Sequence, residues 1–156
     1  MVFKFSRMFG DNMEHVAIGG APSSEGLRMW LEECYGCCYH GYGSTEMGPV
    51  AGDDGYLWDG VEWKLEDVAD MGYFSKDKPY PRGELLLKTP YMIHEYHNNT
   101  ENTRHAFTQD GYFKTGDIVE ILKQGKAGTQ IRIIDRRSNF FKLAGGKIYE
   151  CICSIY

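Results

Sequence analysis

The amino-terminal part of the chain has the hydrophobic pattern of a strand–helix–strand unit. A short apolar run, His15 to Ile18, ends in a glycine pair, and Ser23 or Ser24 is a candidate N-cap for a following helix. Apolar residues then recur at helical spacing, at Leu27, Trp30, Leu31 and Cys34. We expect this helix to end at Gly36 and to pack its apolar face on a sheet, whose next strand is Cys37 to His40.

The pattern changes at Gly55 to short alternating segments separated by Gly, Pro and Asp. The expected strands are Val61–Leu65, Glu84–Lys88, Tyr112–Phe113, Ile118–Leu122 and Gln130–Ile134. They predict an antiparallel sheet or small barrel, with a hairpin loop at Gln124–Gly128. One helix is expected to interrupt the strands, from Asn98 or Asn99 to about Phe107, with Glu101 in its first turn.

Composition narrows the class of protein. A chain of 156 residues with 42% hydrophobic residues is long enough to bury the core of one domain. Its 17 basic and 22 acidic residues give a net charge of −5 without a basic run, so nucleic acid is not an expected partner. No stretch has the length and hydrophobicity of a transmembrane segment, and Lys4 and Arg7 interrupt any secretory signal.

The five cysteines favour reduced thiols, and therefore a cytoplasmic protein, over a disulfide framework. A zinc site is the alternative, built from Cys34, Cys37, Cys38, His40, Cys151 and Cys153. Such a site would require closure across the whole chain, so buried, uncoordinated thiols are the preferred interpretation.

The segment Gly41–Glu46 carries the densest candidate chemistry. Tyr42 can stack on a purine, and Gly43 allows backbone amides to approach a phosphate. Thr45 can donate to a phosphate oxygen, and Glu46 can hold the accompanying Mg²⁺. Taken alone, the segment is better explained as a solvated turn capped by Ser44 and Thr45, because glycine-rich turns are common.

Two later segments carry further polar candidates. Asp117, in Thr115-Gly116-Asp117, can accept two hydrogen bonds from the vicinal diol of a ribose, although an ordinary turn is the favoured interpretation of the segment taken alone. Asp135–Gly146 contains Arg136, a planar donor for phosphate or ribose oxygens, and Lys142, a point charge. The alternative for this segment is a charged, solvated strand edge.

In combination, these segments resemble the adenylate-forming superfamily of acyl-CoA synthetases, luciferases and peptide-synthetase adenylation domains. The similar segments, in order, are Gly19–Pro22 (adenine-side turn), Gly41–Glu46 (aromatic-Gly-x-Thr-Glu motif), Gly83–Tyr96, Gly111–Asp117 (ribose motif) and Ile133–Gly146 (hinge motif). The resemblance extends from Val16 to Ile148 and is closest to the branch of long-chain acyl-CoA synthetases and carboxylic acid reductases. Within it, Asp67–Thr89 is more similar to the reductases.

The resemblance implies a role for each matching residue. Tyr42 would stack on adenine, Thr45 would contact the α-phosphate, and Glu46 would hold Mg²⁺, which makes Thr45 and Glu46 the candidate catalytic residues. Asp117 would bind the ribose hydroxyls, and Arg136 the ribose or phosphate. The other implied positions are Gly20, Ala21 and Pro22, which would line the adenine pocket, Gly43 in the nucleotide-binding motif, and Asp135 at the hinge.

The resemblance also implies a mixed α/β fold with three parts. Residues 1–54 would end an αβ nucleotide-binding subdomain, 55–134 would form a small antiparallel β-barrel-like subdomain, and 135–156 the hinge and the start of a carboxyl-terminal lid. The implied reaction joins a carboxylic acid, expected to be a fatty acid, to AMP from ATP. The acyl group would then pass to the thiol of CoA or of a carrier phosphopantetheine.

Two expected parts of such an enzyme have no counterpart in the sequence. Nothing in residues 1–15 resembles the family's phosphate loop, and the lid with its lysine should follow Glu150. We therefore expect an internal piece of a longer polypeptide, whose remainder would be a partner. The alternatives are a catalytically inactive nucleotide-binding fragment and a piece that self-associates through an exposed core face.

Overall fold

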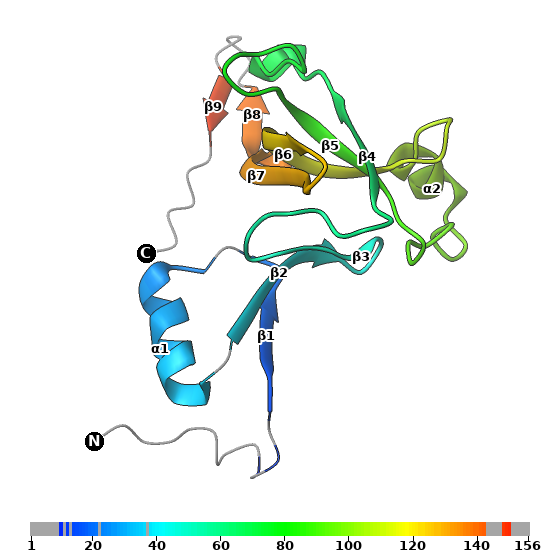
Figure 1. Ribbon diagram of the computed structural model, residues 1–156. Coiled ribbons are helices and arrows are strands. Elements are labelled where there is room, and N and C mark those ends of the chain that lie inside the picture. The colour runs from blue at the N-terminus through cyan, green and yellow to red at the C-terminus, as the bar shows by residue number, and fades with distance from the viewer. Residues whose placement is uncertain are drawn as a thin grey trace.

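The computed structural model describes residues 10, 12, 14–21, 23–36, 38–142 and 148–150. Its amino-terminal unit is a three-stranded sheet in the order β1-β2-β3, formed by Val16–Gly19, Cys38–Ser44 and Gly48–Gly52. Strands β1 and β2 are parallel and joined through helix α1, Glu25–Tyr35, whereas β2 and β3 are antiparallel. The helix lies along one side of this sheet (Figure 1), so the predicted strand–helix–strand unit is confirmed.

Both ends of α1 are where the sequence predicts them. The Oγ of Ser24 accepts a hydrogen bond from the backbone N–H of Leu27 at 3.3 Å, which caps the first turn. Gly36 ends the helix with a positive φ of 80°, and its N–H donates to the carbonyl of Glu32 at 2.7 Å. These local bonds fix the helix boundaries without help from the rest of the fold.

The apolar face of α1 is covered less than its pattern predicts. Cys34 is buried, but Leu27 and Trp30 remain 44% and 45% exposed. Only part of the predicted face therefore packs on the sheet within the described residues. Cys34 is a free, buried thiol and Cys38 is half-buried, whereas Cys37, Cys151 and Cys153 lie outside the described residues.

The second unit is a four-stranded antiparallel sheet in the order β4-β5-β6-β7. Its strands are Glu62–Glu66, Arg82–Lys88, Phe113–Gly125 and Gly128–Arg136. The two strands predicted over 112–122 are one continuous strand, β6, which runs through a local irregularity at 115–117 where its register with β5 shifts. The bonds of the described residues do not include a β4–β7 pair that would close this sheet into a barrel.

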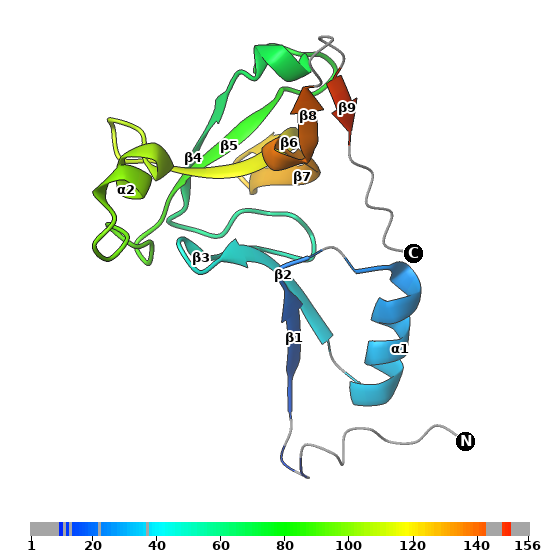
Figure 2. The ribbon, with the colours of Figure 1, turned by 180° about the vertical axis from the view of Figure 1, so that it is seen from behind.

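Helix α2, Thr100–Ala106, projects from one end of the second sheet (Figure 2). Asn99 caps it, since its side-chain oxygen accepts from the N–H of Asn102 at 3.0 Å, and Phe107 follows its last residue, as predicted. A short hairpin, β8 (Phe140–Lys142) with β9 (Ile148–Glu150), ends the described chain. Among the described residues, neither helix is long and apolar enough to cross a membrane.

A short irregular segment, residues 55–58, joins the two sheets. Leu57 bridges to Ala51 of β3, and its N–H also donates to the carbonyl of Thr129 in β7 at 2.9 Å. In return, the N–H of Ile131 donates to the carbonyl of Gly55 at 2.9 Å. We call residues 55–58 the seam, because they hydrogen-bond to an edge strand of each sheet.

One hydrophobic core extends under both sheets. It contains Met47, Val50, Ala51, Leu57, Leu85, Leu87, Phe113, Val119, Ile121 and Ile131. Since its members come from β3 and the turn before it, the seam and three strands of the second sheet, the core fixes the two sheets against each other. The mixed α/β architecture predicted from the sequence is confirmed, and residues on different sheets can form one site.

Candidate functional site

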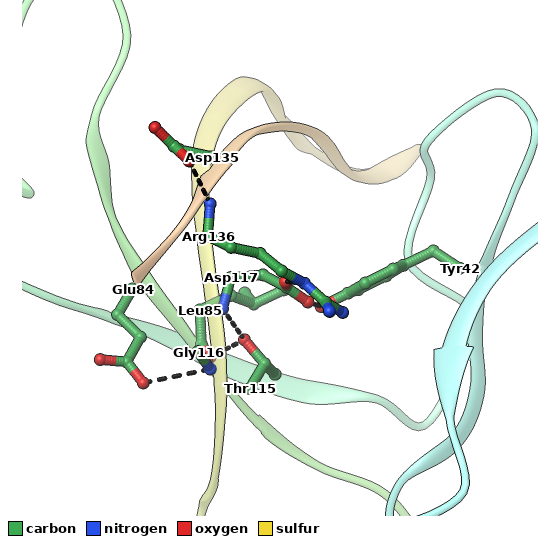
Figure 3. A network of polar contacts seen from close by, with 8 residues as sticks. All are labelled: Tyr42, Glu84, Leu85, Thr115, Gly116, Asp117, Asp135 and Arg136. Atoms are coloured by element: carbon green, nitrogen blue, oxygen red, sulfur yellow. Dashed lines mark hydrogen bonds and ion pairs between the residues drawn. The ribbon is translucent and has the colours of Figure 1, made fainter. Parts of the chain in front are cut away.

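Asp117 projects from an irregular part of strand β6. Between the paired residues Glu84–Ile118 and Leu86–Lys114, a single residue of β5, Leu85, faces residues 115–117 of β6. The Oγ1 of Thr115 donates to the carbonyl of Leu85 at 2.8 Å and accepts from the N–H of Asp117 at 3.0 Å. Bulges of this kind re-aim a side chain, and here the side chain is the carboxylate of Asp117 (Figure 3).

Two donors hold the two oxygens of the Asp117 carboxylate. The hydroxyl of Tyr42 donates to Oδ2 at 2.7 Å, and the Nε of Arg136 donates to Oδ1 at 2.7 Å. Arg136 lies directly opposite Asp117 in the β6–β7 pair, whereas Tyr42 reaches across from β2 of the other sheet (Figure 3). The structure thus brings three of the predicted nucleotide-binding residues together.

The electrostatics of this cluster keep Tyr42 neutral and Arg136 charged. Asp117 is only 3% exposed, yet its carboxylate is matched by the guanidinium of Arg136. Burial, together with the adjacent Asp117, raises the pKa of Tyr42 far above its ordinary value, so the phenol remains a neutral donor. The hydrogen bond to Asp117 raises the pKa of Arg136.

Tyr42 lies on a strand, although the segment around it is predicted as a loop. Strand β2 continues to Ser44, with an irregularity between Tyr42 and Gly43. A Cβ on Gly43 would lie 2.5 Å from the carbonyl oxygen of Gly48, so only glycine allows β3 to approach this closely. Glycine here serves strand packing, and the hydroxyl of Tyr42 is already occupied by Asp117.

Thr45 and Glu46 lie in the turn that follows β2. Thr45 is exposed, and Glu46 is half-buried beside Tyr96, whose hydroxyl donates to Oε1 at 3.1 Å. A hydrogen bond with Ser44 is the main cause that lowers the pKa of Glu46, so its carboxylate is ionised at neutral pH. No set of three His, Cys, Asp or Glu side chains that could hold a metal occurs among the described residues. A single ionised carboxylate is the kind of protein ligand that Mg²⁺ takes when phosphates and water supply its other ligands, so Glu46 fits the predicted role chemically.

The other predicted positions lie around this cluster. The backbone of Gly19 pairs with Gly41 of β2, so the glycine turn with Gly20 and exposed Ala21 adjoins the strand that carries Tyr42. Pro22 lies outside the described residues. Asp135 immediately precedes Arg136, and its Oδ1 accepts a hydrogen bond from the backbone N–H of Arg136 at 2.6 Å. The hinge role of Asp135 stays a prediction.

Comparison with known proteins identifies the family. The family described as "AMP-binding enzyme" matches residues 3–97, more than half of the 156-residue chain. The chain belongs to the AMP-binding enzyme family. Asp117 and Arg136 lie outside the matched range, but Asp117 accepts a hydrogen bond from Tyr42 inside that range, and Arg136 donates to Asp117.

Two curated relatives of this AMP-binding chain represent two kinds of protein. A carboxylic acid reductase of Mycobacterium marinum is 37% identical over 90% of this chain, which corresponds to 12% of the reductase. The peroxisomal long chain acyl-CoA synthetase 7 of Arabidopsis thaliana is 37% identical over 92% of this chain and 22% of its own length. The chain therefore spans less than a quarter of either relative.

A solved structure matches the same region. The A domain of a carboxylic acid reductase from Segniliparus rugosus, in complex with AMP and a co-purified carboxylic acid, is 39% identical with a TM-score of 0.71. The match covers 86% of this chain and 21% of the A-domain chain. The agreement in sequence and structure extends the family assignment to the fold of both sheets.

The sequence did not identify two side chains that support the site of this AMP-binding chain. Tyr96 donates to Glu46, and nothing in the periodicity of its segment points to that contact. Glu84 is buried between the bulge and Arg137, where its Oε1 accepts from the N–H of Gly116 at 3.2 Å and its Oε2 from Arg137 at 2.5 Å. The sequence signal that could have identified Glu84 is a carboxylate directly before three leucines in a predicted strand, because a carboxylate buried with them would need polar partners.

Proposed function

We propose that this chain provides the nucleotide-binding face of an enzyme that activates a carboxylic acid with ATP, forming acyl-AMP and pyrophosphate. The observation that carries the proposal is the buried carboxylate of Asp117, held by Tyr42 and Arg136 where the two sheets meet. An ionised, preorganised carboxylate is the acceptor that a ribose diol requires. The family assignment and the AMP-bound relative support the same ligand.

In this proposal, the ribose hydroxyls take the place of the Tyr42 hydroxyl on Asp117. Ribose then donates to the carboxylate, Arg136 remains beside it, and the ring of Tyr42 is free to stack on adenine. Gly20 and Ala21, with Pro22, line the adenine side, while Thr45 contacts the α-phosphate. Glu46 would hold Mg²⁺, which would offset phosphate charge.

The proposed reaction converts a poor electrophile into a good one. A carboxylate oxygen attacks the α-phosphorus of ATP, the bond to pyrophosphate breaks, and a thiol of CoA or phosphopantetheine afterwards displaces AMP from the acyl group. We propose a fatty acid as the substrate, supported by the relative named as a long chain acyl-CoA synthetase. Cytoplasmic location stays a prediction, since that relative is named as peroxisomal.

The proposal assigns a separate role to each part of the chain. Residues 1–54 and 55–134 would each supply one side of the nucleotide site, as Tyr42 and Asp117 do. Residues 135–156 would lead into a lid, with Asp135 at its hinge. Catalysis then depends on residues supplied by the rest of the polypeptide, whereas nucleotide binding depends on the cluster described above.

Calorimetry with AMP tests the binding step. We expect saturable binding, weakened about tenfold or more in Asp117→Asn, because at least one charged hydrogen bond to ribose is lost. Asp110→Asn is the matched control, since it removes a carboxylate that pairs with Lys64 near the start of the same strand. Absence of AMP binding by the unsubstituted chain, or equal loss in both variants, would overturn the proposal.

The activation step requires its own assay. A form of the protein extended to its natural ends should release pyrophosphate from ATP only when a carboxylic acid is present, and a panel of acids of increasing chain length would identify the substrate class. AMP binding without acid-dependent release from that form would establish the alternative function, a nucleotide-binding protein without catalysis.

A further inference from the structure

Glu84 is the most deeply buried carboxylate of the described residues outside the proposed ribose contact. Only 2% of it is exposed, on a strand that otherwise contributes leucines to the core. Its two oxygens have different partners: Oε1 accepts from the backbone N–H of Gly116, and Oε2 from the guanidinium of Arg137. Figure 3 shows the first of these bonds beneath the Asp117 cluster.

Each partner of Glu84 adjoins a residue of the proposed ribose site. Gly116 immediately precedes Asp117, and Arg137 immediately follows Arg136. Gly116 has a positive φ of 70°, so the direction in which Asp117 leaves the bulge depends on the conformation of this residue. One carboxylate therefore contacts the backbone of β6 at Gly116 and the side chain of Arg137, the first residue after β7, each one position from a member of the Asp117–Arg136 pair.

Stability alone does not explain a charged side chain at this position. Burying a carboxylate carries a desolvation cost that its partners often only balance, and apolar replacements of buried ion pairs are frequently neutral or stabilising. What such a pair provides is a fixed relative position of the groups it joins. The hydrogen bond from Arg137 to Glu84 is strong enough to be the main cause that raises the pKa of Arg137.

We propose that Glu84 is a positioning residue of the nucleotide site, which acts through Gly116 and Arg137 to hold Asp117 and Arg136 at the spacing that a ribose diol requires. This inference rests on the proposed function, because it assigns Glu84 to the same site. Glu84 itself does not contact the nucleotide in this proposal, and its substitution alters ribose recognition indirectly.

Two ligands distinguish an effect of a substitution on ribose recognition from an effect on folding. AMP and 2′,3′-dideoxy-AMP differ only in the two hydroxyls that Asp117 would bind, so the ratio of their affinities measures that contact. We expect Glu84→Gln and Arg137→Gln to weaken AMP binding about tenfold, as expected for one lost charged hydrogen bond, with little change for the dideoxy ligand. Arg137→Lys keeps the charge opposite Glu84 and should restore most of the ratio.

Arg132→Gln is the matched control for Arg137→Gln. Arg132 is half-exposed on β7 and pairs with the nearly buried Glu120 of β6, as Arg137 pairs with Glu84, but it adjoins neither Asp117 nor Arg136. Thermal unfolding of each variant, measured alongside, reports any general loss of structure. If Glu84→Gln does not fold, Arg137→Gln still tests the proposal from the exposed end of the pair.

The outcomes separate the two proposals. If the unsubstituted chain prefers AMP to the dideoxy ligand, but Arg137→Gln retains that preference or Arg132→Gln loses it equally, the role of Glu84 is refuted and the nucleotide site remains. If the unsubstituted chain shows no preference for AMP, the ribose site itself is refuted, and the role of Glu84 with it. A preference lost in Arg137→Gln and kept in Arg132→Gln supports the inference.

Discussion

Tyr42→Phe is the substitution that tests most directly how the nucleotide would enter its site. It removes the hydroxyl that occupies Oδ2 of Asp117 at 2.7 Å and leaves the aromatic ring for stacking. In the free chain this hydroxyl satisfies a buried carboxylate, whereas a bound ribose would supply its own donors to the same oxygen. The hydroxyl therefore stabilises the free chain and competes with the ligand.

The geometry sets the size of both effects. A neutral donor to an ionised carboxylate contributes about 1.5–3 kcal/mol net, and Asp117 is too buried for water to replace it easily. We therefore expect Tyr42→Phe to lower the free energy of unfolding by about 1.5–3 kcal/mol in the absence of ligand. Because the ligand no longer displaces a hydroxyl, AMP should bind about tenfold more tightly, which corresponds to about 1.4 kcal/mol.

Linkage between folding and binding provides the assay. Chemical denaturation at increasing AMP concentration gives the free energy of unfolding of Tyr42→Phe and of the unsubstituted chain. The gap between the two values should narrow as AMP saturates, because tighter binding compensates the lost hydrogen bond. Calorimetry gives the two affinities independently. Weaker AMP binding by Tyr42→Phe, or a gap that stays constant at saturation, would refute the reasoning and indicate that the hydroxyl contacts the nucleotide directly.

Three further predictions concern the surface, the core and the bulge. Asp110 has a pKa lowered to about 2 from 3.8, chiefly by its hydrogen bond from Lys64; the resulting stabilisation is present above pH 3.8 and is lost as the pH falls toward about 2. Lys64→Met should raise this pKa toward 3.8 in an NMR titration, and an unchanged titration would contradict the assignment. Leu87→Ala, in a fully buried position, should lower the free energy of unfolding by about 2–5 kcal/mol in denaturant titrations, and a loss below about 1 kcal/mol would contradict the core described above. Thr115→Val removes both bulge bonds of the hydroxyl and should cost about 1–3 kcal/mol and weaken AMP binding; unchanged affinity would show that Asp117 keeps its direction without them.

Features governed by local chemistry were predictable from the sequence. The caps of both helices, Ser24 and Asn99, function through hydrogen bonds within three residues, so the sequence narrowed each helix start to two adjacent residues, one of which is the cap. Strand β3 was not predicted, because its residues Gly48–Gly52 include proline and two glycines, which ordinarily mark a turn. It is a strand because Val50 and Ala51 pack into the core shared by both sheets.

Features that depend on distant partners were not predictable from patterns. The bond between Tyr42 and Asp117 joins residues 75 positions apart, and no periodicity carries that information. The family resemblance placed both residues at one ligand, but it assigned the ring of Tyr42 to adenine and did not anticipate its hydroxyl on Asp117. Glu84 was not predicted as a site residue for the same reason, since its partner Arg137 is 53 positions away.

The seam between the sheets gives the site a particular sensitivity to main-chain geometry. Gly55 adopts a positive φ of 72°, and a Cβ there would lie 2.5 Å from the carbonyl oxygen of Ile131. At Gly55 the main chain of the seam therefore lies against the main chain of β7 with no room for a side chain, although Leu57, two residues later, packs into the shared core. A single methyl group at Gly55, outside the ligand cluster, would push the seam away from β7 and so shift the sheet that carries Tyr42 relative to the sheet that carries Asp117.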